Sequence, residues 1–523
     1  MTANLALALG CVFVGWISLA PARQALGPML YHLATLPVGV IGWSFVAVLT
    51  SVLGVKPTFV WSLLGLALYT ATVAGLCYLF CRRDTGDAAE ASRTRVGGAL
   101  SGWRGYAVFG GAYALIVVAL AVSGLTIAGF DGYAHYELSG WYLHDTGALS
   151  VPIMGSRNIL VPALHMGTRV FGGDWTYVVY PLFSINALAL LGWAMWSVAF
   201  AGLPAARRGL LTALFVLCVA VVPAWVLHTW YVHSNMVSAL YVTLSVVALF
   251  VAAGAFDRRS RSSATPAAAS LVAGLAVAGL TLARPDGLAY AFHGLLLAAV
   301  LHFTGMIGRR AVGALYSGLL VPLVVVYGAA FLRLGLWGKE GKLLGTWAAA
   351  LLVAIALFGV VTALLPRIRV LRTHLGPTDV MKIVVLASLA TIVPVAASMP
   401  AQFALAARNM VANLLLKGGW GQTWAVLVCL IVATLFFPLR DDEGPWSHLL
   451  LFAVVEFMAI AAAVHGVTHP GEISTTDSFN RIALHIVPVA FLYIASYLGR
   501  LLMYPSSRAG VGETGDTGRS VAS

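Results

Sequence analysis

The chain has 523 residues, of which 60% are hydrophobic and 10% charged, with a mean hydropathy of +0.91 and a formal net charge of +12. So few charges cannot cover that much apolar surface in water, and the composition therefore excludes a water-soluble fold. The arginines concentrate in short loops between apolar runs, which is a signal of membrane topology and not of nucleic-acid binding.

Apolar runs of transmembrane length recur along the whole chain. A bilayer core of about 30 Å needs about 20 apolar residues per helix, and the weak alternation of apolar and polar residues argues against a β-barrel. We therefore predict an all-α polytopic membrane protein, a bundle of about 13–15 transmembrane helices with short amphipathic helices in the outer loops. The predicted spans are 3–20, 29–54, 58–80, 104–127, 177–202, 209–228, 234–255, 267–283, 286–306, 312–334, 345–366, 379–397, 423–438, 447–465 and 482–503.

The arginine-rich loops set the predicted orientation. If these loops lie in the cytoplasm, the N-terminus lies outside, and the chain is a multi-pass protein of the inner or plasma membrane with its active site facing the periplasm or exterior. We predict N-terminal transmembrane helices in 1–80, a cytoplasmic linker in 81–103, a catalytic core in 104–503 and a disordered cytoplasmic tail in 504–523.

The longest predicted outer loop, 128–176, holds a concentration of scarce charged residues. Asp131 directly follows a predicted helix, which would hold its carboxylate at the outer membrane face. Apolar surroundings disfavour the charged form of a carboxylate and so suit it to accept a proton from a membrane-bound substrate. The alternative is that Asp131 caps an amphipathic helix and contacts water.

Four further polar residues of this loop, His135, Glu137, His144 and Asp145, are predicted to contact substrate. Imidazole and carboxylate are ordinary metal ligands, so His135 and Glu137 are the candidates for a divalent cation. The alternative is that the four bond among themselves and to lipid headgroups. We assign no metal site and no required cofactor, and leave a divalent cation open.

Two arginines at predicted outer helix ends can bind phosphate. Arg284 lies in LTLARPDGLAYAF, where a proline breaks the helix, and Arg481 begins the last helix in TTDSFNRIALHIVP. An arginine at headgroup level can hold a phosphate through two parallel hydrogen bonds. The alternatives are ion pairs of Arg284 with Asp286 and of Arg481 with Asp477. Asp286 is also a candidate substrate ligand.

A second outer break, VLHTWYVHSNM, carries His228, Tyr231, His233 and Asn235, which we predict to line an acceptor pocket. Polar and aromatic residues are also common at membrane interfaces without a ligand. Arg408 and Lys417 in the loop 398–422 are further candidates for the donor phosphate, although an interfacial amphipathic helix explains them equally well.

Three stretches together resemble the GT-C membrane glycosyltransferases, a superfamily that includes protein O-mannosyltransferases, aminoarabinose transferases and arabinofuranosyltransferases. FDGYAHYELSGWYLHDTGAL resembles the family's first outer loop with its aspartate, and ARPDGLAYAF resembles a turn common before a mid-chain helix. TDSFNRIALHIVPVAFLYIAS resembles the arginine-containing start of a late helix. Here the aspartate follows the fourth predicted helix.

The resemblance implies a sugar donor carried on a polyprenyl phosphate and inverting transfer to a lipid, glycan or protein acceptor. Asp131 takes the role of general base, while Arg284 and Arg481, with Lys417 and Arg408 as candidates, neutralise the departing phosphate. The partners implied are this donor, membrane lipids and the acceptor. The alternatives are a transporter or flippase of a lipid-linked sugar and a non-catalytic subunit of a glycan-assembly complex.

Overall fold

The structure is a computed structural model, and several predicted features fall outside the residues that it describes. These features are Asp131, Asp286, residues 82–102 of the linker and the tail 504–523. The described residues are 1–81, 103–126, 132–150, 153, 158–256, 264–284, 287–334, 353–362, 364, 379, 382–383, 386, 390, 392–436, 446–468 and 478–503.

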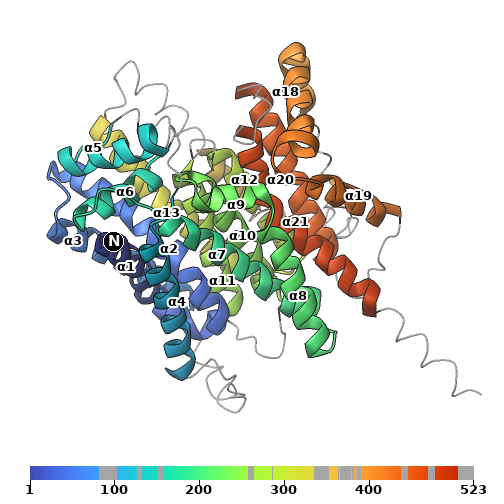
Figure 1. Ribbon diagram of the computed structural model, residues 1–523, viewed down its shortest axis with the longest axis horizontal. Helices are drawn as coiled ribbons and strands as arrows, with labels where there is room; N and C mark the ends of the chain where they lie inside the picture. The colour runs from blue at the N-terminus through green and yellow to red at the C-terminus, as the bar shows by residue number, and fades with distance from the viewer. Residues whose placement is uncertain are drawn as a thin grey trace, which may run out of the picture.

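Helices account for the regular structure in these residues, which contain no β-strand (Figure 1). The α-helices are α1 (Thr2–Leu19), α2 (Arg23–Leu53), α3 (Phe59–Cys81), α4 (Trp103–Ser123), α5 (Leu138–Thr146), α6 (Leu160–Val170), α7 (Val179–Ala194), α8 (Ala205–Ala220), α9 (Pro223–Trp230), α10 (Ser234–Ala253), α11 (Thr265–Ala283), α12 (Gly287–Phe303), α13 (Arg309–Leu334), α17 (Ile392–Ser398), α18 (Pro400–Ala412), α19 (Thr423–Phe436), α20 (Trp446–Thr468) and α21 (Ser478–Met503). A 3₁₀ turn, η1 (Ala20–Ala22), joins α1 to α2, and three segments are π-helical: η2 (Gly132–Glu137), η4 (Met195–Ala199) and η7 (Asn413–Lys417).

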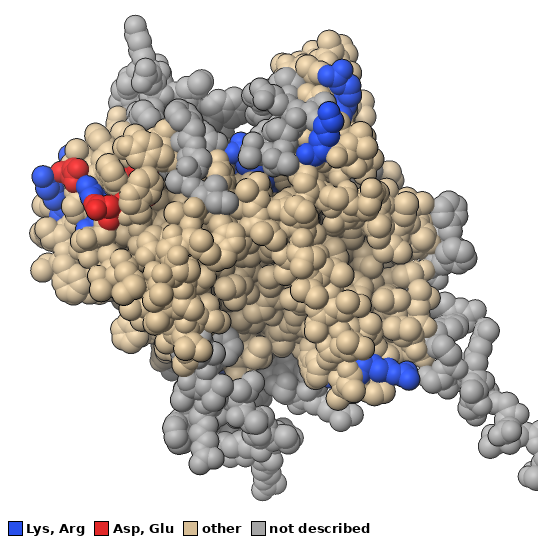
Figure 2. Space-filling model, in the orientation of Figure 1, with Lys and Arg blue, Asp and Glu red and all other residues tan. Residues whose placement is uncertain are grey.

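The described part of the chain contains seven helical runs long and apolar enough to cross a membrane, or eight if the bent pair α8 and α9 is one span. The longest run, Thr2–Leu53, folds back on itself as the packed pair α1 and α2, with a kink at Gly27, whose φ of 69° and ψ of 165° are not helical. Figure 2 shows a broad band without charged side chains between charged residues at opposite edges of the molecule. The prediction of an all-α polytopic membrane protein is confirmed.

The predicted span 209–228 is not one straight helix, because α8 and α9 meet at an angle of 70°. Val222 leaves the helical conformation with ψ of 124°, and Pro223 is the first residue of α9. A proline has no N–H to continue α8 and pushes the residue before it toward an extended conformation. The bend brings Trp225 against α7, where its indole N–H donates to the Ser184 hydroxyl at 2.8 Å.

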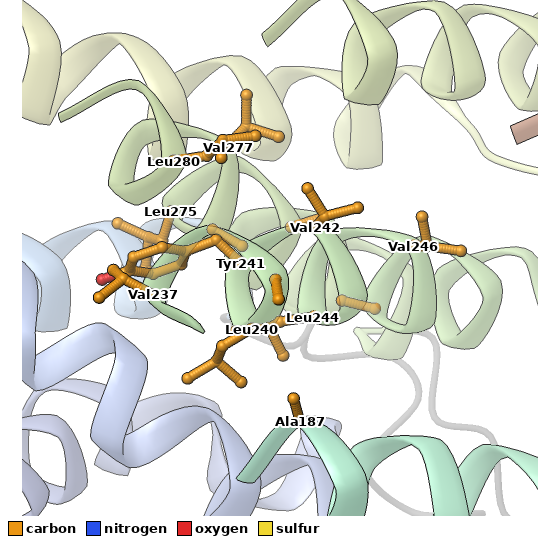
Figure 3. Packing of buried hydrophobic residues seen from close by; sticks show 14 of the residues in the cluster. Ala187, Val237, Leu240, Tyr241, Val242, Leu244, Val246, Leu275, Val277 and Leu280 are labelled. Atoms are coloured by element: carbon orange, nitrogen blue, oxygen red, sulfur yellow. The ribbon is translucent and has the colours of Figure 1, made fainter. Parts of the chain in front are cut away.

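The centre of the bundle is formed by α10 and α11. Every residue of α10 is buried, and so is 94% of the most apolar 18-residue stretch of α11. Figure 3 shows apolar side chains of α7, α10 and α11 filling the space between these helices. Helix α13 packs so closely on α11 that a Cβ at Gly274 would overlap the backbone of Leu315. Small residues allow such approach in lipid, where packing must replace the hydrophobic effect.

The hairpin of α1 and α2 depends on the same kind of contact. A Cβ at Gly39 would overlap the carbonyl of Cys11, and one at Gly15 would overlap the carbonyl of Thr35. The two helix backbones are therefore in contact at both glycine positions. Helix α2 also packs against α6, α11 and α13, so the N-terminal helices share the core of the bundle.

A proline inside α2 is accommodated by polar side chains from other helices. Pro37 has no N–H, which deprives the carbonyl of Leu33 of its usual partner within the helix. The side-chain amide of Asn186 on α7 donates to that carbonyl at 2.8 Å. The hydroxyl of Tyr241 on α10 donates to the carbonyl of Pro37 at 2.8 Å. These two bonds tie α2 to the centre of the bundle.

The close contact of α1 with α2 predicts the effect of Gly39→Leu. The new side chain meets rigid backbone, so we expect a loss of about 1–3 kcal/mol or more, measured as a fall in thermal unfolding temperature in detergent. Gly10→Leu on α1 is the control, because no atom lies within 4 Å of a Cβ there. Equal unfolding temperatures for the two variants would contradict this account of the hairpin.

Candidate functional site

Four helix ends meet in one polar region: the end of α9, the start of α10, the end of α11 and the start of α21. The backbone is extended at Tyr231, His233 and Arg284, each of which lies just outside a helix. Polar side chains are thereby concentrated where the helices stop. We call the following residues the arginine–histidine cluster: His228, Tyr231, His233, Asn235, Arg284 and Arg481.

One branch of the cluster begins at Arg284. Its guanidinium donates to the Asn235 side-chain oxygen at 3.1 Å, so the amide nitrogen of Asn235 is the atom that faces Nδ1 of His228 at 3.2 Å. Nδ1 of His228 is then an acceptor, and the proton of the neutral ring lies on Nε2. This Nε2 atom is buried and has no hydrogen-bond partner among the described residues.

The other branch begins at Arg481, whose guanidinium donates to Nε2 of His233 at 3.0 Å. Nδ1 of His233 lies 3.3 Å from the Ser234 hydroxyl, which in turn lies 3.1 Å from the Tyr136 hydroxyl. The two branches are linked by Tyr231, whose ring stacks on the His233 ring with the ring centroids 5.7 Å apart. This arrangement links η2, which carries Tyr136, to the first turn of α21.

His485 lies one turn beyond Arg481 on α21 and is completely buried. It is within electrostatic reach of both arginines and of His228. Neither of its ring nitrogens has a hydrogen-bond partner in the described part of the chain. The region therefore combines two cationic side chains with buried imidazole groups, which is an arrangement suited to an anion.

Asn158 was not predicted from the sequence, yet it fixes the end of α11. It is buried with φ of 58°, and its side-chain amide donates to the carbonyl of Thr281 at 2.5 Å and lies 3.2 Å from that of Arg284. The same amide lies 2.9 Å from the Tyr327 hydroxyl. Asparagine is one of the few residues that adopts this backbone conformation readily, but no sequence pattern marks the position.

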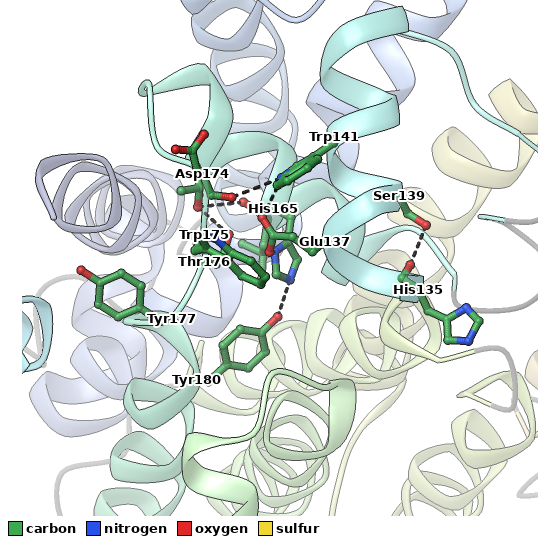
Figure 4. A network of polar contacts seen from close by, with 12 residues as sticks. His135, Glu137, Ser139, Trp141, His165, Asp174, Trp175, Thr176, Tyr177 and Tyr180 are labelled. Carbon is green, nitrogen blue, oxygen red and sulfur yellow. Dashed lines mark hydrogen bonds and ion pairs between the residues drawn. The ribbon is translucent and has the colours of Figure 1, made fainter. Parts of the chain in front are cut away.

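Glu137, predicted to contact substrate, lies in a buried network of polar side chains (Figure 4). Its carboxylate forms an ion pair with His165 of α6, and neither side chain is exposed. Nε1 of Trp141 donates to the other carboxylate oxygen at 2.9 Å, and Nε2 of His165 lies 2.7 Å from the Tyr180 hydroxyl. The network ties α5 to α6 and α7.

The structure does not bring the metal candidates His135 and Glu137 together, since His135 points away from the Glu137 network (Figure 4). In the described ranges no group of three or more His, Cys, Asp or Glu side chains is placed to hold a metal ion. His144 and Asp145 bond to each other at 2.8 Å near the surface. That hydrogen bond lowers the pKa of Asp145, which is thus ionised at neutral pH.

Of the two further phosphate candidates, Lys417 has the closer link to the cluster. It ends η7, and the carbonyl of the next residue, Gly418, lies 3.1 Å from the side-chain amide of Asn480, the neighbour of Arg481. Arg408 is exposed on α18, a helix at one edge of the molecule (Figure 1).

Comparisons with known proteins give one likeness of fold. No family model and no curated protein matches the chain. Among solved structures, it is similar to the archaeal oligosaccharyltransferase AglB from Archaeoglobus fulgidus, in complex with an inhibitory peptide and a dolichol-phosphate. The identity is 15% and the TM-score 0.37, and the match covers 75% of this chain and 49% of that one. Function must therefore be argued from the site itself.

The buried pair of Glu137 and His165 predicts a large effect of Glu137→Ala on stability. Removal of the carboxylate leaves His165 buried without its ionic partner, which costs about 3–5 kcal/mol. Asp145→Ala on the same helical segment is the control. Its carboxylate is 59% exposed, so we expect a loss of no more than about 1 kcal/mol. Thermal unfolding measures both, and a loss for Glu137→Ala as small as that of the control would contradict a structural role for the pair.

Proposed function

We propose that the protein is a membrane glycosyltransferase. It moves a sugar from a polyprenyl-phosphate donor to a lipid, glycan or protein acceptor at the outer face of the inner or plasma membrane, with inversion. The observation that carries the proposal is the convergence of Arg284 and Arg481, from α11 and α21, on one group of histidines.

The two arginines suit the leaving group of this reaction. When the bond between the anomeric carbon and the phosphate oxygen breaks, its electron pair goes to the phosphate, whose negative charge grows. Fixed guanidinium groups stabilise that charge most in the transition state. Asn235 and His233 orient the two side chains by accepting hydrogen bonds from their guanidinium groups.

The buried imidazoles support the same assignment. Nε2 of His228 and both ring nitrogens of His485 have no hydrogen-bond partner among the described residues. A buried donor without a partner costs about 1–3 kcal/mol, and phosphate oxygens would satisfy it. We assign these groups to the donor phosphate, and Tyr231 and His233 to the acceptor side of the same region.

Asp131 is proposed as the general base. It accepts the proton of the acceptor hydroxyl while the hydroxyl oxygen attacks the anomeric carbon from the face opposite the phosphate. Asp131 lies outside the described residues, but it directly precedes η2 in the sequence. Within η2, Tyr136 bonds to Ser234 beside the cluster, so the described part of this segment contacts the proposed donor site.

The donor site predicts strong effects of Arg284→Gln and Arg481→Gln. With purified protein and a panel of polyprenyl-phosphate sugars, we expect wild type to release polyprenyl phosphate from one donor. Each variant should lower kcat/KM by about 10²–10³, because it removes one cation from the departing phosphate. Arg309→Gln is the matched control, since Arg309 is exposed at the start of α13 and outside the cluster. Thermal unfolding verifies that each variant folds.

Two results would overturn the proposal. One is turnover by both cluster variants at the rate of the control. The other is binding without turnover for every donor in the panel, which would favour a transporter or a non-catalytic subunit.

Asp131→Asn tests the base separately from phosphate binding. The amide keeps the size of the side chain but accepts no proton, so kcat should fall by about 10²–10⁴ while the Kd for the donor stays near that of wild type. Isothermal titration with the active donor measures the Kd. An unchanged kcat would remove Asp131 from the mechanism without affecting the assignment of the arginines.

A further inference from the structure

An apolar groove runs along the side of the bundle between α7 with its continuation η4 and α8. Its volume is about 740 Å³, within the range of about 300–1,000 Å³ that is typical of small-molecule sites. Gly192, Gly209 and Ala213 line the groove together with the rings of Trp193 and Trp196. Its lining is almost entirely apolar, so it suits a hydrocarbon chain.

One end of the groove is cationic. The guanidinium of Arg208, at the start of α8, lies 4.8 Å from the centre of the Trp196 ring, which lines the groove. Arg208 is held there by a hydrogen bond of 2.7 Å to the carbonyl of Ala201. Arg207 beside it is exposed. An apolar groove with Arg208 at one end, and the exposed Arg207 next to it in sequence, matches a molecule with a hydrocarbon chain and an anionic head.

The groove lies far from the arginine–histidine cluster. Ala199, the last residue of η4, packs against Gly499 near the end of α21, whereas Arg481 begins that helix. The 18 residues from 481 to 499 span about 27 Å at 1.5 Å per residue. This length is close to the thickness of the bilayer core, so the groove faces the opposite leaflet from the cluster.

We propose that the groove binds an anionic glycerophospholipid. One acyl chain lies in the groove against the rings of Trp193 and Trp196, and the phosphate faces Arg207 and Arg208. Tryptophan is enriched at the level of the headgroups, and each arginine near the membrane surface favours an anionic lipid about five-fold. The proposal does not depend on the glycosyltransferase activity, because the groove and the cluster share no residue.

The test is competition between two lipids for the purified full-length protein. Equimolar phosphatidylglycerol and phosphatidylcholine are added in detergent, and native mass spectrometry counts the lipid retained. We expect phosphatidylglycerol to be enriched about five-fold or more in wild type, and Arg207→Gln to lower that preference about five-fold. Gly209→Phe should abolish retention, because a Cβ at this position already lies 3.5 Å from the Trp196 ring and a larger side chain fills the groove.

Leu210→Phe is the matched control, since Leu210 is 69% exposed on the next position of α8 and does not line the groove. Ala213→Phe is a second filled variant, used if Gly209→Phe fails to fold. Equal retention of the two lipids by wild type would overturn the proposal. It would also be overturned if a folded Gly209→Phe or Ala213→Phe variant retained as much phosphatidylglycerol as wild type. Preferential retention of added polyprenyl phosphate would overturn it as well.

Discussion

The structure depends on one constraint, that polar groups inside a bilayer must find their partners within the chain. The carbonyl of Leu33, released by Pro37, receives the amide of Asn186 from another helix. His293 of α12, inside the bundle, forms an ion pair with Glu456 of α20. Such bonds join helices that are distant in sequence, because in lipid no water is available to satisfy the groups. Packing of small residues brings other helix pairs, α1 with α2 and α11 with α13, into close contact.

The same constraint explains why the candidate site lies where helices stop. A helix end leaves carbonyl and N–H groups without partners inside the helix, so it demands polar neighbours. At the end of α11 the amide of Asn158 meets that demand and thereby fixes the backbone of Arg284. The extended residues between α9 and α10 carry Tyr231 and His233 to the first turn of α21. The contacts that complete the helix ends therefore also position the residues that carry the candidate binding groups.

The sequence predicts more of the fold than of the contacts. Composition and the length of apolar runs place the helices, and polar breaks in those runs single out Arg284, Arg481 and His228. The bend before Pro223 was missed because the apolar run continues through it. The pair of Glu137 and His165 could not be predicted, since the partners lie on different helices and no spacing relates them. The same holds for every hydrogen bond that joins Arg284 to Asn235 and Arg481 to His233.

The two polar regions near η2 differ in whether their buried polar groups have hydrogen-bond partners within the described residues. Glu137 and His165 are each other's partners, and Trp141 and Tyr180 bond to the same pair, so this region stabilises the fold through contacts within the chain. In the other region Nε2 of His228 is buried, within electrostatic reach of Arg481 and without a hydrogen-bond partner in the described residues. Such a donor costs about 1–3 kcal/mol unless something binds it. A ligand that accepted this hydrogen bond would recover that cost, and the positive charge of the nearby guanidinium would favour an anion.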